Sequence, residues 1–187
     1  CFLTSSLPAE NWPHFLGPDY NAHSRETNLR KNLSDGLPVL WEIPKGISHT
    51  PPVILGDRVM FIHAPDGKET ITCVNAESGT QIWEHSYSVQ LGHTYGIADA
   101  PRSAPVIDPD SGLLFTVGIE GALTCINVQS GELVWQLNLD DEFGPSPFFF
   151  GRGSSPLILG ERLIVHAGGT EATVVALQKS TGELVWK

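Results

Sequence analysis

The stretch Thr124–Trp135, TCINVQSGELVW, decides the fold, because the chain carries it three times. Near-copies stand at Thr72–Trp83, TCVNAESGTQIW, and at Val175–Trp186, VALQKSTGELVW. The Trp residues that close these copies are 52 and 51 residues apart. A period of this size is typical of a repeat architecture, in which each repeat is one supersecondary unit.

Each copy predicts a β-hairpin. A short run of alternating apolar residues indicates a strand, a Gly provides the turn, and a second strand ends at the Trp. The turn glycines are Gly79, Gly131 and Gly182. A second apolar hairpin precedes each copy, at residues 52–61, 105–117 and 156–165. Four strands per unit joined by tight turns predict an all-β chain of propeller blades.

The repeat resembles that of the pyrroloquinoline-quinone-like (PQQ-like) β-propeller family. That family's pattern is A-L-D-x-x-T-G-x-x-x-W, and Val175–Trp186 matches it best, while Cys73 and Cys125 stand where the pattern has Ala. The resemblance covers residues 50–187 and implies four-stranded antiparallel blades around a channel. Members similar to this chain include secreted bacterial propellers and the lipoprotein of the outer-membrane β-barrel assembly machinery.

The repeats place three blades at residues 48–84, 103–136 and 154–187. Residues 37–44, LPVLWEIP, resemble the end of a blade and predict a closing strand around Trp41. Because propellers need about 4–8 blades, we expect an incomplete ring, the N-terminal part of a propeller of about eight blades. Completion of the ring by oligomerisation is the alternative. Trp83, Trp135 and Trp186 are expected to be structural anchors of the repeat.

The N-terminal region divides into two segments. Residues 1–9 have the small and apolar character of a signal-peptide remnant, with a disordered arm or an acylated Cys1 as alternatives. Residues 10–36 predict an extended arm. Its opening, NWPHFLGPDYN, resembles the W-P-x-F-x-G-P start of secreted members of the family. We expect Trp12, Phe15 and Tyr20 to pin this arm to the flank of the propeller.

Composition excludes several function classes. The formal net charge of −10 argues against a nucleic-acid partner, which would need a basic surface. No apolar run approaches the ~20 residues of a transmembrane helix. The histidines lack metal-ligand spacing, so no metal site is predicted.

Two long joins between blades carry the candidate binding site. The joins 84–102 and 137–153 should emerge on one face near the channel, where propeller loops often carry function. Each ends at an Arg, a side chain suited to carboxylate or phosphate. We expect these arginines to hold an anionic ligand or partner segment, with aromatic and polar neighbours: Arg102, Arg152, Asp99, His93, Tyr95, His49 and Phe150. In the alternative, each Arg pairs with an acidic neighbour and ties two blades together.

The cysteines bear on the cofactor. Cys73 and Cys125 occupy equivalent positions in neighbouring blades, so we expect small buried residues and no disulfide. Quinone-dependent alcohol dehydrogenases of this fold carry an adjacent Cys pair, which this chain lacks. The sequence therefore shows no evident cofactor, and the resemblance allows PQQ with calcium only in the full-length protein.

The leading functional hypothesis is a non-catalytic propeller scaffold in the bacterial periplasm or outside the cell. It would bind a protein partner or a small anionic ligand at the channel face. One alternative is a part of a PQQ-dependent dehydrogenase. A second alternative is a sensor module of a larger signalling protein.

Overall fold

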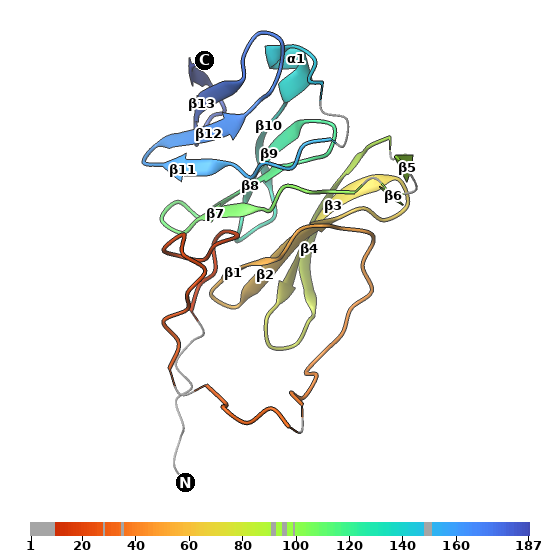
Figure 1. Ribbon diagram of the computed structural model, residues 1–187, viewed down its shortest axis with the longest axis vertical. Helices are drawn as coiled ribbons and strands as arrows, with labels where there is room; N and C mark the ends of the chain where they lie inside the picture. Colours follow the sequence, from red (N-terminus) through yellow and green to blue (C-terminus); the bar gives the residue numbers. More distant parts are fainter. Residues whose placement is uncertain are drawn as a thin grey trace.

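The structure, a computed structural model, describes residues 10–27, 29–34, 36–90, 93–94, 97–98, 100–147 and 151–187, with backbone only at 93–94 and 97–98. Its main body is three four-stranded antiparallel sheets that follow one another along the chain (Figure 1). The prediction of three four-stranded blades is confirmed. No helix of the described chain is both long and apolar enough to cross a bilayer.

The blades share one topology, with strands in sequence order across each sheet. Blade 1 contains β1 (Val53–Leu55), β2 (Arg58–His63), β3 (Lys68–Asn75) and β4 (Gln81–Ser88). Blade 2 contains β7 (Val106–Asp108), β8 (Leu113–Val117), β9 (Ala122–Asn127) and β10 (Leu133–Asn138). Blade 3 contains β11 (Leu157–Leu159), β12 (Arg162–His166), β13 (Val174–Gln178) and β14 (Leu184–Trp186). The outer strands of blades 1 and 2 run a few residues beyond the predicted ends.

The two long joins contain short elements that the sequence did not predict. The first join has a small hairpin of β5 (His93–Thr94) and β6 (Ile97–Ala98). The second begins with α1 (Leu139–Phe143), a helix of five residues. The Asn138 side chain caps α1 by accepting hydrogen bonds from the Asp140 and Asp141 N–H groups, as short polar side chains do at helix starts.

The core lies between the blades, and the sheet of blade 2 contributes to it with both faces. One cluster joins blades 1 and 2 and contains Met60, Ile62 and Leu114. A second joins blades 2 and 3 and contains Phe115 and Leu163. Every residue of β8, LLFTV, is buried, which explains why that strand is apolar on both faces.

The repeat Trp residues connect neighbouring blades. Trp83 of β4 lies on Gly131 in the turn after β9, and its Nε1–H donates to the Val128 carbonyl at 2.9 Å. Trp135 of β10 makes the same contact with Gly182 and the Lys179 carbonyl. A Cβ at Gly131 would lie 2.5 Å from the Trp83 ring, and its φ of +76° also favours Gly.

Trp41 makes this contact without belonging to a described sheet. Its ring lies on Gly79, and its Nε1–H donates to the Ala76 carbonyl at 2.9 Å. Residues 37–44 form no strand in the described chain. Trp41 therefore stands where the outer-strand Trp of a preceding blade would stand, and the closing strand stays a prediction.

The N-terminal arm docks differently from our expectation. Trp12 pairs with Ile54 of the innermost strand of blade 1, which is not the outer flank. Phe15 is 60% exposed and Tyr20 is 47% exposed, so Phe15 in particular does not pin the arm. The prediction overlooked that the inner strands β1 and β7 have unpaired edges to which an extended segment can add.

The Trp–Gly contact can be tested at blade 1. We expect Trp83→Ala to lower the free energy of unfolding by roughly 3–5 kcal/mol, since it removes a buried large aromatic. Trp83→Phe keeps most of the ring and loses the Nε1 hydrogen bond, so it should cost less. Chemical denaturation of the full-length protein measures both, and equal losses in the two variants would contradict ring packing as the main contribution.

Candidate functional site

Three chain segments that lead into the inner strands lie side by side at one end of the blades. The His49 N–H donates to the Pro101 carbonyl at 3.0 Å. The Ser103 hydroxyl donates to the Ser154 carbonyl, also at 3.0 Å. We call residues 48–50, 101–103 and 151–154 the channel mouth. Both predicted arginines belong to it.

Arg152 uses its guanidinium inside the protein. The side chain is 3% exposed. Its Nη1 donates to the Ala167 carbonyl, and its Nη2 forms an ion pair with Asp140 of α1. A Cβ at Gly121 would lie 2.8 Å from its Nε, so this turn of blade 2 also packs against it. These contacts match the alternative in which the Arg ties neighbouring blades.

Two of the other predicted residues, Arg102 and His49, belong to the described mouth. Arg102 is half-buried, and its side chain lies beside Gly153, whose added Cβ would lie 3.7 Å from the Arg102 Cβ. His49 is exposed. The backbone of His93 lies in β5, but its side chain lies outside the described part, as do the residues Tyr95, Asp99 and Phe150. The roles of all these residues in binding stay predictions.

A buried carboxyl that the sequence did not single out lies behind the mouth. Glu69 of β3 is fully buried, and its Oε1 accepts a hydrogen bond of 2.9 Å from the Ile119 N–H in the β8–β9 turn. It pairs in register with Tyr87 of β4. A Cβ at Gly118 would lie 2.2 Å from the Glu69 Oε2 and 2.6 Å from the Tyr87 hydroxyl. Gly118 is therefore required by close approach.

Glu69 and Arg152 both form a hydrogen bond with the backbone of Ile119. The Ile119 N–H bonds to Glu69, while the Ile119 carbonyl accepts from the Arg152 N–H at 3.4 Å. The sequence held one signal for Glu69. The equivalent positions in the other two copies, counted back from the Cys or Ala of the repeat, hold Gly121 and Ala172. A charged residue at a position otherwise occupied by small residues departs from the repeat.

Burial shifts the pKa values of the ionisable groups in the blade cores. Burial raises the pKa of Glu69, although the bond from the Ile119 N–H opposes this shift. Cys73 and Cys125 are free and buried. Burial raises the pKa of Cys73 to about 11 and that of Cys125 to about 12. Both stay neutral thiols at physiological pH, as predicted for small core residues.

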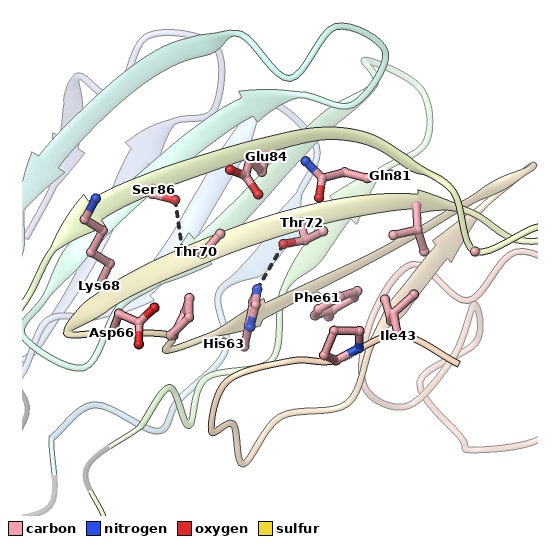
Figure 2. A pocket seen from close by; sticks show the side chains of 14 residues that line it. Ile43, Phe61, His63, Asp66, Lys68, Thr70, Thr72, Gln81, Glu84 and Ser86 are labelled. Atoms are coloured by element: carbon pink, nitrogen blue, oxygen red, sulfur yellow. Dashed lines mark hydrogen bonds between the residues drawn. The ribbon is translucent and has the colours of Figure 1, made fainter. Parts of the chain in front are cut away.

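A cavity of about 540 Å³ lies on the face of blade 1 that points away from blade 2 (Figure 2). His63 lines it, and its Nε2 lies 3.0 Å from the Thr72 hydroxyl. The equivalent face of blade 2 carries Thr124 and Ile126, and Ile126 packs in the cluster between blades 1 and 2. The face of blade 1 that carries this cavity therefore corresponds to the face with which blade 2 packs against blade 1.

The mouth is a polar surface with a small cavity. A cavity of about 220 Å³ is lined by Gly151, Arg152, Gly153, Ser154 and His166, which is below the roughly 300–1,000 Å³ of most ligand pockets. The Ser154 hydroxyl lies 3.3 Å from the His166 Nδ1. Within the described ranges, no three His, Cys, Asp or Glu side chains cluster as metal ligands would.

The tie through Arg152 predicts a stability effect. Arg152→Ala removes charge-assisted hydrogen bonds and should lower the free energy of unfolding by roughly 1.5–3 kcal/mol. The exposed Arg162 of β12 provides the control, because Arg162→Ala should change stability by less than about 0.5 kcal/mol. Equal effects of the two substitutions in a urea titration would refute the tie.

The buried Glu69 carboxyl should make the stability of the protein depend on pH. Its raised pKa means that the folded protein binds the Glu69 proton more tightly than the unfolded chain, so this contribution stabilises below about pH 4.5 and is lost as the pH rises. Glu69→Gln is neutral at every pH and keeps an acceptor for the Ile119 N–H. It should raise the free energy of unfolding at pH 7.5 and lose that advantage near pH 4. The exposed Glu77 provides the control, because Glu77→Gln should leave the free energy of unfolding unchanged at both pH values. A gain in Glu69→Gln that is independent of pH would contradict the prediction.

Comparison with known proteins identifies the family. A profile of the family described as outer membrane protein assembly factor BamB matches residues 67–187, which is more than half of the chain. Methanol dehydrogenase [cytochrome c] subunit 1 of Paracoccus denitrificans is 26% identical over 192 residues, covering 95% of this chain and 29% of that protein.

Solved structures show the same fold. Quinohemoprotein alcohol dehydrogenase from Comamonas testosteroni superposes with a TM-score of 0.68 at 17% identity, covering 98% of this chain and 28% of that one. BamB from Moraxella catarrhalis gives a TM-score of 0.53 at 18% identity, covering 79% and 38%. The chain thus spans less than two fifths of the length of each relative. From the profile match, the chain belongs to the BamB-type family of PQQ-like repeat β-propellers.

Proposed function

We propose that the chain contributes three blades to a non-catalytic propeller scaffold of the bacterial cell envelope, which binds a protein partner at the channel mouth. The observation that carries this proposal is the internal use of the Arg152 guanidinium by Asp140 and the Ala167 carbonyl. An arginine that is committed in this way shapes a surface, and it is a poor ligand for a small anion. The match to a family of assembly factors agrees with this role.

The geometry of the mouth suits a macromolecular partner. Hydrogen bonds between His49 and Pro101, and between Ser103 and Ser154, join the three segments into one continuous surface. Glu69 holds the adjacent β8–β9 turn through Ile119. A surface that is fixed in advance loses little conformational entropy on binding, which favours protein–protein recognition.

We expect the described residues of the mouth not to form a PQQ site on their own. This quinone carries three carboxylates, and it would need several cationic side chains together with a pocket of matching size. Arg152 is already neutralised by Asp140, and the cavity beside it measures about 220 Å³. We therefore assign no catalytic step to these residues.

A dehydrogenase remains the second candidate, because the similarity to methanol dehydrogenase of Paracoccus denitrificans extends over 95% of the chain. In that case the cofactor would rely on residues other than those described at this mouth. The quinone would accept electrons from an alcohol substrate. The blades described here would supply the frame that holds the channel open.

Site-specific crosslinking tests the scaffold. A photoreactive amino acid at His49, an exposed mouth position, should give an adduct with a discrete partner protein in intact cells. The same group at Glu77, exposed in the β3–β4 turn at the other end of blade 1, should give no such adduct. A partner captured equally from both positions would contradict binding at the mouth.

Reconstitution tests the alternative in the same preparation. Purified full-length protein is incubated with PQQ and calcium, desalted, and assayed for quinone absorbance and for methanol-dependent reduction of an artificial electron acceptor. The scaffold predicts neither retained quinone nor dye reduction. Retained quinone together with methanol-dependent dye reduction would contradict the scaffold hypothesis and support the dehydrogenase hypothesis.

A further inference from the structure

The N-terminal segment lies on strand edges that face the channel. Trp12 exchanges two hydrogen bonds of 2.9 Å with Ile54 of β1, and the Ile107 N–H of β7 donates to the Pro13 carbonyl at 2.8 Å. In each sheet, the first strand has its other edge paired to the second strand. The segment therefore covers the inner edges of blades 1 and 2 side by side (Figure 1).

The segment lies towards the end of the blades opposite the mouth. The Asn11 Oδ1 accepts a hydrogen bond of 2.8 Å from the Gly56 N–H, in the β1–β2 turn. The mouth segments lie at the other end of the same strands, where His49 precedes β1 and Ser103 precedes β7. Contacts of this segment are thus independent of the binding surface proposed above.

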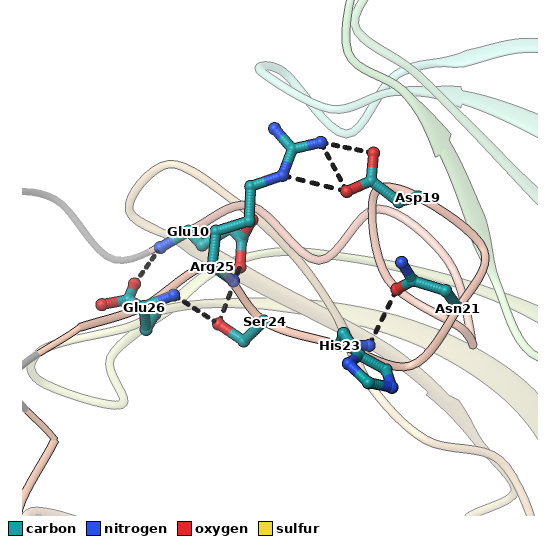
Figure 3. Close-up of polar contacts among 7 residues, drawn as sticks. All are labelled: Glu10, Asp19, Asn21, His23, Ser24, Arg25 and Glu26. Carbon is teal, nitrogen blue, oxygen red and sulfur yellow. Dashed lines mark hydrogen bonds and ion pairs between the residues drawn. The ribbon is translucent and has the colours of Figure 1, made fainter.

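Polar contacts close the segment into a loop (Figure 3). The Glu10 N–H donates to the Glu26 Oε1, and the Glu10 Oε2 accepts from the Arg25 N–H at 2.9 Å and from the Ser24 hydroxyl at 2.7 Å. Arg25 also forms an ion pair with Asp19. Because its two ends meet, residues 10–26 can dock and leave as one unit. We call them the N-terminal loop.

The docked loop contains backbone strain. Tyr20 has a φ of +52° and Ala22 a φ of +58°. The left-handed region is unfavourable for residues other than Gly, and such residues persist only where surrounding contacts hold them. Hydrogen bonds inside the loop hold both residues, from the Tyr20 N–H to the Gly17 carbonyl at 3.1 Å and from the Ala22 N–H to the Leu16 carbonyl at 2.8 Å.

His14 is the buried ionisable group of the loop. It is 7% exposed, its ring stacks on Tyr20 with 3.6 Å between centroids, and its Nδ1 has no hydrogen-bond partner among the described residues. Burial lowers the pKa of His14. A cationic imidazole at this place would lose its hydration without gaining an acceptor at Nδ1.

The groups around His14 do not compensate a positive charge. The face of the Tyr20 ring attracts a cation only weakly, because Tyr20 is 47% exposed. The strand residues that bond to the loop, Ile54 and Ile107, are apolar, and the next residue of β7, Asp108, is already paired with Lys179 at 2.9 Å. Within the loop, Asp19 is occupied by Arg25, and the Glu10 carboxylate by the bonds that close the loop.

We propose that the N-terminal loop is an acid-released strap, which covers the channel-facing edges of blades 1 and 2 near neutral pH and leaves them when His14 takes up a proton. Release would uncover the Ile54 and Ile107 N–H groups at the end opposite the mouth.

The sign of the pH dependence follows from the lowered pKa of His14. The released loop binds the proton with the ordinary pKa near 6.5, and the docked loop binds it more weakly. Docking is therefore fully stable above pH 6.5 and weakens as the pH falls towards the lowered value. Over this window the ratio of docked to released loop falls by at most about tenfold per pH unit.

Hydrogen–deuterium exchange of the full-length protein tests the strap. Protection of the Ile54 and Ile107 amides is measured at pH 7.5 and pH 5.5, with each value corrected for the intrinsic exchange rate at that pH. We expect protection to fall by up to about tenfold at pH 5.5. His14→Phe keeps an aromatic ring for the stack on Tyr20 and cannot titrate, so its protection should hold at both pH values.

Two comparisons make the outcome decisive. His23→Phe changes an exposed residue of the same loop, and it should follow the wild-type protein. If His14→Phe is already unprotected at pH 7.5, His14→Leu replaces it under the same criterion. Unchanged protection of the wild type at pH 5.5, or an equal fall in the His14 variant, would overturn the proposal.

Discussion

The contact between a Trp of one blade and a Gly of the next holds the molecule together. Trp41, Trp83 and Trp135 lie on Gly79, Gly131 and Gly182, and each indole N–H donates to a backbone carbonyl near that Gly. The Trp closes one repeat while its partner belongs to the following one. The repeat therefore specifies the interface between blades as well as the hairpin, because a ring can approach the turn only where no Cβ is present.

Much of the fold could be predicted from this period. The spacing of Trp83, Trp135 and Trp186 predicted the blades, since strand alternation and turn glycines are local features. The docking of Trp83 on Gly131 could not be predicted, because periodicity does not say which of two equivalent glycines a Trp contacts. The place of the N-terminal loop was missed for a similar reason. Free inner edges exist only after the sheets have formed.

The candidate site shows the same division. The sequence predicted that Arg102 and Arg152 lie at one end of the blades, because the number of strands in each blade was predicted correctly. It could not show that Asp140 would form an ion pair with Arg152, because the α1 helix that carries Asp140 was not predicted. Glu69 was missed because a single charge in an alternating strand usually faces solvent, whereas here it faces the next blade.

Hydrogen bonds of Ile119 connect the interface between blades 1 and 2 with the channel mouth. Glu69 reaches it from blade 1 and Arg152 from the join that leads to blade 3. A partner that displaced the Arg152 segment would therefore also disturb the packing of blade 1 against blade 2. Because packed interfaces resist small deformations, such a partner is expected to bind to the mouth as it stands. The opposite end of the channel differs, since the N-terminal loop covers it with few contacts and a strained backbone. Rigidity at one end and a releasable cover at the other follow from one cause: the repeat fixes the blade interfaces and leaves the inner edges free.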